Sequence, residues 1–283
     1  MRMLDALQRW GARRLGPERC RRIIRQVAHL AGIDLLGLAH QEMGILKYQN
    51  LDVTGEEHLI RNVLPRWISR PQPVLVDVGA NVGEFARRLR AQFPAAAICA
   101  FEPVAATFAK LQENVRGLDV RCFDVGLGRQ EATAPIYRSS REDLSSLASL
   151  YPEVARSMHR FADAVAETIR LRTLDAVAAE QRWDAIDFLK IDTEGNEFAV
   201  LQGAENLIRG GRIGAILFEF NEMNVAARVF LRDFYDLLPD YRFFRLDTRR
   251  LIPLGPYQPR NEIFQFQNLL AVRAAGSPAK ERP

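Results

Sequence analysis

From about residue 73 onward, apolar and polar positions follow two alternating patterns. Short apolar runs, each the length of a buried strand, occupy residues 73–78, 97–101, 120–123, 186–191 and 213–220. Helical spacing of apolar residues follows four of them, at 85–93, 104–116, 198–208 and 225–238. This alternation predicts βαβ units and therefore an α/β fold, with a mostly parallel sheet covered on both faces.

The end of the chain departs from this alternation. Residues 241–246 and 266–272 are two apolar runs joined by a loop with proline and glycine, which predicts an antiparallel C-terminal hairpin. Residues 139–168 fit neither pattern, apart from helix-like spacing at 154–165, and are interpreted as an insertion over the carboxyl edge of the sheet. The main domain is expected to span 49–275, and 276–283 to be a frayed tail.

Before the main domain, residues 1–48 are predicted to form a basic helical appendage. Apolar residues in the first 32 positions recur at helical spacing on either side of Gly16–Pro17, which predicts two short amphipathic helices. The first thirty residues carry a net charge of +6, whereas the whole chain carries +4. The arginine-rich face is interpreted first as a solvated face of helices packed on the body. Contact of residues 1–32 with an anionic membrane surface, or with nucleic acid, is the alternative.

Composition narrows the class of protein further. The chain has 283 residues, of which 48% are hydrophobic and 26% charged, as in an ordinary folded domain. No run approaches the length of a membrane span, and the first ten residues lack the apolar block of a signal peptide. Cys20, Cys99 and Cys122 lack the spacing of a zinc site or a disulfide framework. We therefore expect a cytoplasmic protein from a reducing compartment.

The first candidate site is the turn after the strand at 73–78. Asp77 is followed by Gly79, Ala80, Asn81 and Gly83, and a helix comes next. Glycines in such a turn let backbone N–H groups approach a ligand closely. A dinucleotide site would place glycine at 81 and 84 as well, and a Walker loop would continue with Gly-Lys-Ser/Thr; neither occurs here. The turn therefore predicts a cofactor site without a pyrophosphate.

Acidic residues follow the second and third strands. Glu102 ends the second strand, where a carboxylate accepts hydrogen bonds from the two ribose hydroxyls of a nucleoside. Asp124 ends the third strand and is predicted either to reach an adenine or to act as a turn residue. A glycine turn with a ribose carboxylate describes S-adenosylmethionine better than a nicotinamide dinucleotide.

More carboxylates gather after the fourth and fifth strands. Asp192 ends the fourth strand, Glu194 lies in the following turn, and Glu197 opens the next helix, where a capping role competes with a functional one. Glu219 lies near the end of the fifth strand, and Asn221 follows it. Because these strand ends share one edge of the sheet, the candidate catalytic residues are Asp192, Glu194 and Glu219.

The motifs, taken together and in this order, resemble the FkbM-type methyltransferases. The resemblance runs from about residue 50 to 272. It rests on six segments: 77–83 (Asp-Val-Gly-Ala-Asn-Val-Gly), 101–103 (Phe-Glu-Pro), 145–147 (Ser-Ser-Leu), 173–175 (Thr-Leu-Asp), 189–197 (Leu-Lys-Ile-Asp-Thr-Glu-Gly-Asn-Glu) and 268–270 (Asn-Leu-Leu). It implies a Rossmann-like fold and methyl transfer from S-adenosylmethionine to a hydroxyl of a sugar, a glycan or a secondary metabolite. Candidate cofactor-binding residues are Asp77, Gly79, Ala80, Asn81, Gly83, Glu102 and Asp124.

Two other functions remain as alternatives. A nucleic-acid methylase could use the basic arm, but the segment after the fourth strand lacks the Pro-Pro-aromatic motif of base N-methylation. Base C5-methylation needs a nucleophilic cysteine, and Cys99 and Cys122 lie inside predicted strands. A non-catalytic cofactor-binding module is the second alternative. Because every expected cofactor position carries a capable residue, the enzyme is favoured.

Deprotonation of the acceptor has two candidate mechanisms. Asp192 is the favoured general base, made more basic by burial and by neighbouring carboxylates. Alternatively, Asp192, Glu219 and Asn221 could hold Mg²⁺, which prefers oxygen ligands. Lys190, two residues before Asp192, opposes a divalent cation and is predicted to be a buried partner of Asp77. No metal is therefore favoured. Of the four histidines, only His159 in the insertion is placed to reach the site.

Overall fold

The computed structural model describes residues 16–45, 50–141 and 147–274, and the chain divides into two compact units, 1–43 and 44–283. In the first unit, helix α2 (Pro17–Leu30) begins at the predicted proline. A further helix, α3 (Leu35–Glu42), was not predicted; Asp34 caps it by accepting a hydrogen bond from the backbone N–H of Leu36. The helix predicted before Gly16 and the tail from 276 lie outside the described residues.

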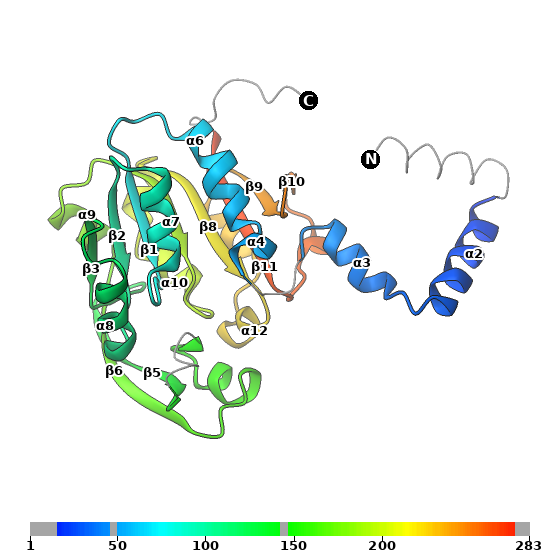
Figure 1. Ribbon diagram of the computed structural model, residues 1–283, viewed down its shortest axis with the longest axis horizontal. Helices are drawn as coiled ribbons and strands as arrows, with labels where there is room; N and C mark the ends of the chain where they lie inside the picture. Colours follow the sequence, from blue (N-terminus) through cyan, green and yellow to red (C-terminus); the bar gives the residue numbers. More distant parts are fainter. Residues whose placement is uncertain (1–15, 46–49, 142–146, 275–283) are drawn as a thin grey trace. The chain divides into compact units, whose positions relative to one another are not determined.

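The second unit is built on an eight-stranded sheet in the order β3-β2-β1-β7-β8-β11-β9-β10 (Figure 1). The five apolar runs predicted as strands form its parallel part, β3 to β8 in that order. Strand β11 runs antiparallel between β8 and β9, so the predicted C-terminal hairpin is confirmed. The strands are β1 (Val74–Val78), β2 (Ala97–Phe101), β3 (Val120–Phe123), β7 (Ile186–Ile191), β8 (Ile213–Phe220), β9 (Tyr241–Leu246), β10 (Leu251–Pro253) and β11 (Gln267–Arg273).

Alternate side chains of the strands enter two hydrophobic cores. On β1, Leu75 joins the core under the first set of helices, whereas Val76 joins the core under the second set. The first set is α4 (Leu51–Thr54), α5 (Glu56–His58), the π-helix η1 (Leu59–Val63), α6 (Leu64–Trp67), α7 (Glu84–Gln92) and α8 (Ala105–Asn114). The second set is α9 (Leu174–Glu180), α10 (Glu197–Gln202), α11 (Glu205–Arg209), α12 (Met223–Ala227) and α13 (Leu231–Leu237). A short 3₁₀ helix, η4 (Pro259–Asn261), precedes β11. Helices on both faces explain why the parallel strands are continuously apolar.

Two predicted helices are each divided in the structure. The helix expected at 198–208 breaks after Gly203, whose missing side chain lets the chain pass the backbone of Gly128; a Cβ there would lie 2.1 Å from that carbonyl oxygen. The helix expected at 225–238 breaks at Arg228, which adopts the left-handed conformation. Apolar spacing alone does not reveal either break, because the apolar positions keep the helical period across it.

A second sheet was not predicted. It contains β4 (Gly126–Leu127), β5 (Ala132–Ser139) and β6 (Ala164–Arg172), in the order β4-β6-β5, and β5 and β6 form an antiparallel hairpin. The insertion at 139–168 lies at the far end of this hairpin. The helix predicted at 154–165 is wrong in extent, because the π-helix η3 (Val154–Met158) ends early and β6 begins at Ala164.

No helix within residues 16–45, 50–141 and 147–274 is long and apolar enough to cross a membrane.

Candidate active site

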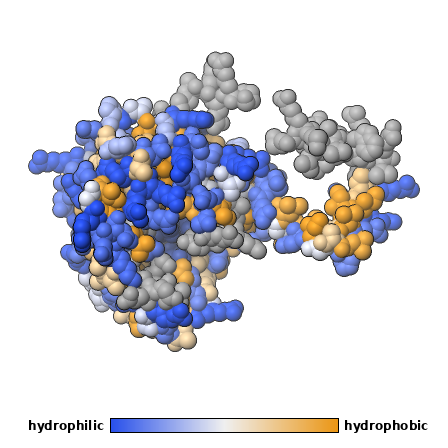
Figure 2. All heavy atoms as spheres, viewed as in Figure 1, coloured by the Kyte–Doolittle hydropathy of each residue, from blue (hydrophilic) through white to orange (hydrophobic). Residues whose placement is uncertain are grey.

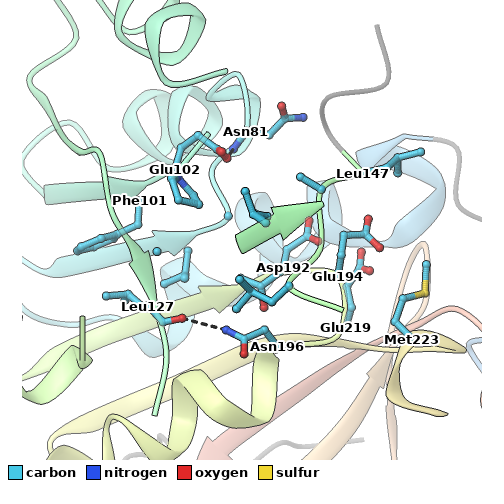
Figure 3. A pocket seen from close by; sticks show the side chains of 18 of the residues that line it. Asn81, Phe101, Glu102, Leu127, Leu147, Asp192, Glu194, Asn196, Glu219 and Met223 are labelled. Carbon is cyan, nitrogen blue, oxygen red and sulfur yellow. Dashed lines mark hydrogen bonds between the residues drawn. The ribbon is translucent and has the colours of Figure 1, made fainter. Parts of the chain in front are cut away.

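A cavity of about 400 Å³ opens at the carboxyl ends of β1, β2, β7 and β8 (Figure 3). The chain builds outward from β1 to β2 and β3 and then crosses back to β7 on the other side of β1. In α/β sheets, ligands bind where the strand order reverses in this way. Of the predicted site residues, six line the cavity: Gly79, Asn81, Glu102, Asp192, Glu194 and Glu219.

The glycine turn after β1 is held against both neighbouring strands. The backbone N–H groups of Gly79 and Ala80 donate to the carbonyl oxygen of Phe101, which ends β2. On the other side, a Cβ at Gly79 would lie 1.7 Å from the carbonyl oxygen of Asp192. With φ at +76°, Gly79 also has a backbone conformation that other residues rarely adopt. The turn therefore needs glycine for close packing as well as for access to a ligand.

Gly83 has a packing role that was not predicted. It does not line the cavity, and a Cβ at this position would lie 2.6 Å from Cδ1 of Leu111 on α8. Its φ of +86° lets the turn enter α7. The structure thus shows that Gly83 allows close packing between α7 and α8, and its role in cofactor binding stays a prediction. Ala80 also lies outside the cavity lining, buried beneath the turn.

Glu102 and Asn81 form the polar edge at one end of the cavity. The carboxylate of Glu102 accepts hydrogen bonds from the backbone N–H of Asn81 (3.1 Å) and of Val104 (2.9 Å). Burial raises the pKa of Glu102 to about 7, although both hydrogen bonds oppose the shift. The side-chain Oδ1 of Asn81 is buried without a hydrogen-bond partner among the described residues. This edge therefore has acceptor atoms available for a ligand.

Asp124 lies outside the cavity. Its side chain is 64% exposed and forms an ion pair with Arg170 of β6 at 3.0 Å. The cavity wall beside Glu102 is apolar instead. Phe101 of β2 contributes to it, together with Leu127 and Ile169 of the second sheet. The unpredicted hairpin β5–β6 thus supplies a surface that the sequence analysis had assigned to Asp124.

A buried lysine lies below the other end of the cavity. The Nζ atom of Lys190 is 2.9 Å from Oδ2 of Asp192 and 3.7 Å from Oδ1 of Asp77, which is fully buried. Burial alone would lower the pKa of Lys190, but Asp192, Asp77 and Glu56 outweigh it and raise that pKa. The predicted pairing of Lys190 with Asp77 is confirmed. Asp77 therefore supports the site from beneath and does not line it.

The acidic residues gather at this end of the cavity (Figure 3). Glu219 is half-buried, and desolvation of its carboxyl group, followed by repulsion from Asp192 and Glu194, raises its pKa well above the ordinary value. One of its oxygens accepts a hydrogen bond from Nδ2 of Asn221 at 3.2 Å. Burial also raises the pKa of Glu194, whereas His159 beside it opposes the shift. Carboxyl groups crowded in this way can hold a proton near neutral pH.

Glu197 stabilises the turn before α10 and does not cap the helix, which has no side-chain cap. Its Oε1 accepts hydrogen bonds from the backbone N–H of Thr193 (2.8 Å) and of Gly195 (3.1 Å), and from the Thr193 hydroxyl. The side chain is buried and does not line the cavity. Glu197 therefore fixes the turn that presents Glu194 and has no direct role at the cavity.

Several residues of the site were not predicted. Glu56 of α5 is buried close enough to Lys190 to affect its charge, and burial raises the pKa of Glu56 to about 7. Its position in the sequence, before the first strand, did not indicate a role in the site, because only folding brings Glu56 near Lys190 of β7. Glu222 and Met223 line the cavity next to Asn221, where their neighbourhood in sequence was a usable signal. Within the described residues, no group of three or more His, Cys, Asp or Glu side chains is arranged to hold a metal ion.

These features define a Rossmann-like domain with carboxylates at the switch point of its sheet. A family model described as "Methyltransferase FkbM domain" matches residues 77–244, more than half of the chain. The chain therefore belongs to the FkbM methyltransferase family. The predicted family and the predicted Rossmann-like fold are both confirmed.

Curated relatives carry methyltransferase names. Methyltransferase sdnD of Sordaria araneosa is 32% identical over 47% of this chain and 61% of its own length. The 2-O-methyltransferase NoeI of Sinorhizobium fredii is 26% identical over 62% and 74%, respectively. The hexuronic acid methyltransferase AglP of Haloferax volcanii is 28% identical over 56% and 60%. The chain thus spans about 60% of the length of sdnD and AglP.

Among solved structures, methyltransferase FkbM from Methylobacillus flagellatus KT is similar, with a TM-score of 0.49 and 13% identity. The similarity covers 88% of this chain and 70% of that one.

Proposed function

We propose that this protein transfers a methyl group from S-adenosylmethionine to a hydroxyl of a sugar, a glycan or a secondary metabolite. The observation that carries the proposal is one cavity with two chemically different ends. One end presents Glu102 and Asn81 beside an apolar wall, and the other presents Asp192, Glu194 and Glu219. Family membership supports the reaction, and the geometry supports the division of labour.

The first end suits S-adenosylmethionine. Each oxygen of Glu102 accepts one backbone hydrogen bond and keeps a lone pair for a ribose hydroxyl. The orphaned Oδ1 of Asn81 offers a further acceptor, and Phe101 and Leu127 form an apolar surface for a base. A volume of about 400 Å³ lies within the usual range of small-molecule sites.

The second end suits a hydroxyl acceptor. The bound cofactor supplies an electrophilic methyl group on a sulfonium, and the protein must orient the acceptor and remove its proton. Asp192, Glu194 and Glu219 surround the space where that proton is released. A buried carboxylate can accept a proton from an oriented hydroxyl as the new bond forms. The three carboxylates act as proton acceptors and as hydrogen-bond partners of the acceptor.

Names of relatives support an oxygen acceptor. NoeI is named a 2-O-methyltransferase and AglP a hexuronic acid methyltransferase. These names concern those proteins. The proposal takes methylation at oxygen from the first name and a sugar-acid acceptor from the second, and extends both to this chain.

A labelled-methyl assay tests the proposal. Purified protein is incubated with radiolabelled S-adenosylmethionine and a panel of p-nitrophenyl glycosides, and a parallel panel contains duplex and single-stranded oligonucleotides. Label on a glycoside is the expected result. Label on the oligonucleotides would support a nucleic-acid methylase. Cofactor binding in calorimetry without transfer to either panel would favour a non-catalytic binding module. EDTA-sensitive transfer restored by Mg²⁺ would favour metal-assisted deprotonation over a carboxylate base.

For the first unit, we propose contact with an anionic membrane surface through α2. Its apolar side chains remain 46–86% exposed, and Figure 2 shows apolar atoms gathered on this helix; they are Ile23, Ile24, Val27 and Leu30. At about 3.6 residues per turn, Arg19 and Arg21 flank this face, as in helices that lie in a lipid interface. Binding to phosphatidylglycerol vesicles, weakened by salt and by Val27→Asp, is expected. Equal binding to neutral and anionic vesicles would overturn the proposal.

A further inference from the structure

The insertion places one histidine against the acidic end of the cavity. His159 directly follows η3, and its Nε2 lies 3.4 Å from Oε2 of Glu194. Both side chains line the cavity, and they are only 10% and 13% exposed. Neither of these two atoms has a hydrogen-bond partner among the described residues. The two atoms therefore face each other as a buried acid and a buried imidazole.

The surrounding structure fixes both members of this pair. The backbone N–H of His159 donates to the carbonyl oxygen of Val154, and its ring stacks on Phe161 with centroids 5.3 Å apart. Glu194 adopts φ of +53°, and its carbonyl oxygen accepts a hydrogen bond from Oγ of Ser149 in the insertion. A left-handed glutamate and a buried polar pair both cost stability. Such costs are typical of functional sites.

The other two carboxylates already have partners. Oδ2 of Asp192 is taken by the ammonium of Lys190, and Oε2 of Glu219 accepts from Nδ2 of Asn221. Glu194 alone among the three predicted catalytic residues has an oxygen that faces an imidazole. Of the three carboxylates, Glu194 is therefore the one placed to exchange a proton with His159.

We propose that Glu194 is the catalytic base for the acceptor hydroxyl and that His159 is the positioning residue that receives the proton from it. This inference rests on the proposed function and names the proton path of the same site. His159 suits the task because its Nε2 faces Oε2 of Glu194. An imidazole has two ring nitrogens, so it can take up a proton at one and give up a proton from the other.

The proton path balances with methyl transfer. The acceptor oxygen forms a bond to the methyl carbon while the carbon–sulfur bond breaks, and its electron pair stays on sulfur. The hydroxyl proton moves to Oε2 of Glu194 and then to Nε2 of His159. The imidazolium then gives up its other ring proton, the one on Nδ1, to water, and His159 is again a neutral imidazole. At the end, the methyl group is on the acceptor oxygen, one proton has gone to water, and Glu194 is again a carboxylate.

Other charged groups affect the pKa of Glu194. Asp192 and Glu222 raise the pKa of Glu194, after burial, so its carboxyl group is a stronger base than an exposed one. The charged groups that interact with Glu194, besides His159, are Asp192 after β7, Glu219 on β8 and Glu222 before α12.

Direct titration of His159 tests the pair without any acceptor. In the ligand-free protein, nitrogen NMR of labelled imidazoles follows His159, assigned from its loss in His159→Gln. Replacing Glu194 with Gln removes the facing charge and should lower the pKa of His159 by about one unit or more. His40 of α3 is the internal control and should not move. An unchanged His159 titration in Glu194→Gln would overturn the pairing.

Turnover tests the proton transfer. His159→Gln should reduce kcat on the best p-nitrophenyl glycoside about 10- to 100-fold and alter its pH profile, with the affinity for S-adenosylmethionine unchanged within about twofold. His40→Gln is the matched control. The double variant with Glu194→Gln should be little worse than Glu194→Gln alone, because the two act in series. A normal kcat and pH profile in His159→Gln would overturn the role. If the wild type methylates none of the probes, the proposed function fails, and the NMR titration still decides the pairing.

Discussion

The two ends of the cavity are built by different means. The end with Asn81 and Glu102 is organised by backbone hydrogen bonds and by a glycine turn, and its polar atoms come from residues that directly follow β1 and β2. The opposite end consists of charged side chains that repel one another and rest on a buried lysine. Its wall includes the insertion, which is distant in sequence.

This difference separates binding from chemistry. A turn fixed by backbone hydrogen bonds, with one carboxylate beside it, holds a constant shape. Such a site suits the cofactor, which is the same in every turnover. Crowded carboxylates are costly to bury, but they can exchange protons near neutral pH. Substitutions should therefore divide into two groups: those at the first end change affinity for the cofactor, and those at the second change stability or turnover.

Lys190→Met should give the largest effect. It leaves Asp77 buried with no opposing charge, and breaking a buried ion pair costs roughly 3–5 kcal/mol of the free energy of unfolding. Urea denaturation measures this loss. Arg87→Met, which removes an exposed cation on α7, is the control and should cost less than about 1 kcal/mol. A wild-type denaturation curve for Lys190→Met would show that the lysine is dispensable.

Asp192→Asn should come next. The substitution keeps the shape and removes the charge that Lys190 holds at the cavity. Turnover should fall about 10²-fold, because Asp192 helps to orient the acceptor hydroxyl and misplacing a reacting group by about 1 Å can cost that much. Calorimetry should show nearly unchanged affinity for S-adenosylmethionine. Near-normal turnover would remove Asp192 from the reaction centre.

Glu102→Ala should act on the first end alone. Losing a charged acceptor for the ribose costs about 1.5–3 kcal/mol, which corresponds to a roughly 10- to 100-fold weaker affinity for S-adenosylmethionine in calorimetry. Asp124→Ala is the control, because Asp124 is exposed and lies outside the cavity. Equal affinity in the Glu102 and Asp124 variants would contradict the assignment of the ribose site.

The pH dependence of cofactor binding should give the smallest effect. Burial raises the pKa of Glu102 to about 7 in the ligand-free protein. Ribose hydroxyls donate to the carboxylate and lower its pKa in the complex. Affinity should therefore be full above pH 7 and fall below it, by at most about tenfold per pH unit. Calorimetric titrations between pH 5.5 and 8.5 measure this, and Glu102→Gln should abolish the dependence.

The sequence predicted the carboxylates of the second end better than the residues of the first. Asp192, Glu194 and Glu219 all line the cavity, whereas four of the seven cofactor candidates, Asp77, Ala80, Gly83 and Asp124, do not. Apolar runs locate the strands, and the residue after each strand is placed at the sheet edge by topology, as Glu102 and Asp192 show. Asp77 and Lys190 could be paired because a parallel register sets them side by side. The hairpin β5–β6 was missed because β5 contains Pro135 and mixes exposed with buried positions. Glu56 and the packing role of Gly83 were missed because their contacts come from packing between elements distant in sequence.

Ser139 pairs with Ala164 at the end of the β5–β6 hairpin, and this pairing determines which segment can be replaced without disturbing the main sheet. The segment between these residues leaves and re-enters the ladder at adjacent positions, about 5 Å apart in an antiparallel pair. It carries Ala148, Leu150 and His159 to the cavity without contributing a strand to the main sheet. We expect that such a segment can be exchanged between related proteins as one unit. Chimaeras with their junctions at this ladder would transfer acceptor preference while the cofactor site stays in place.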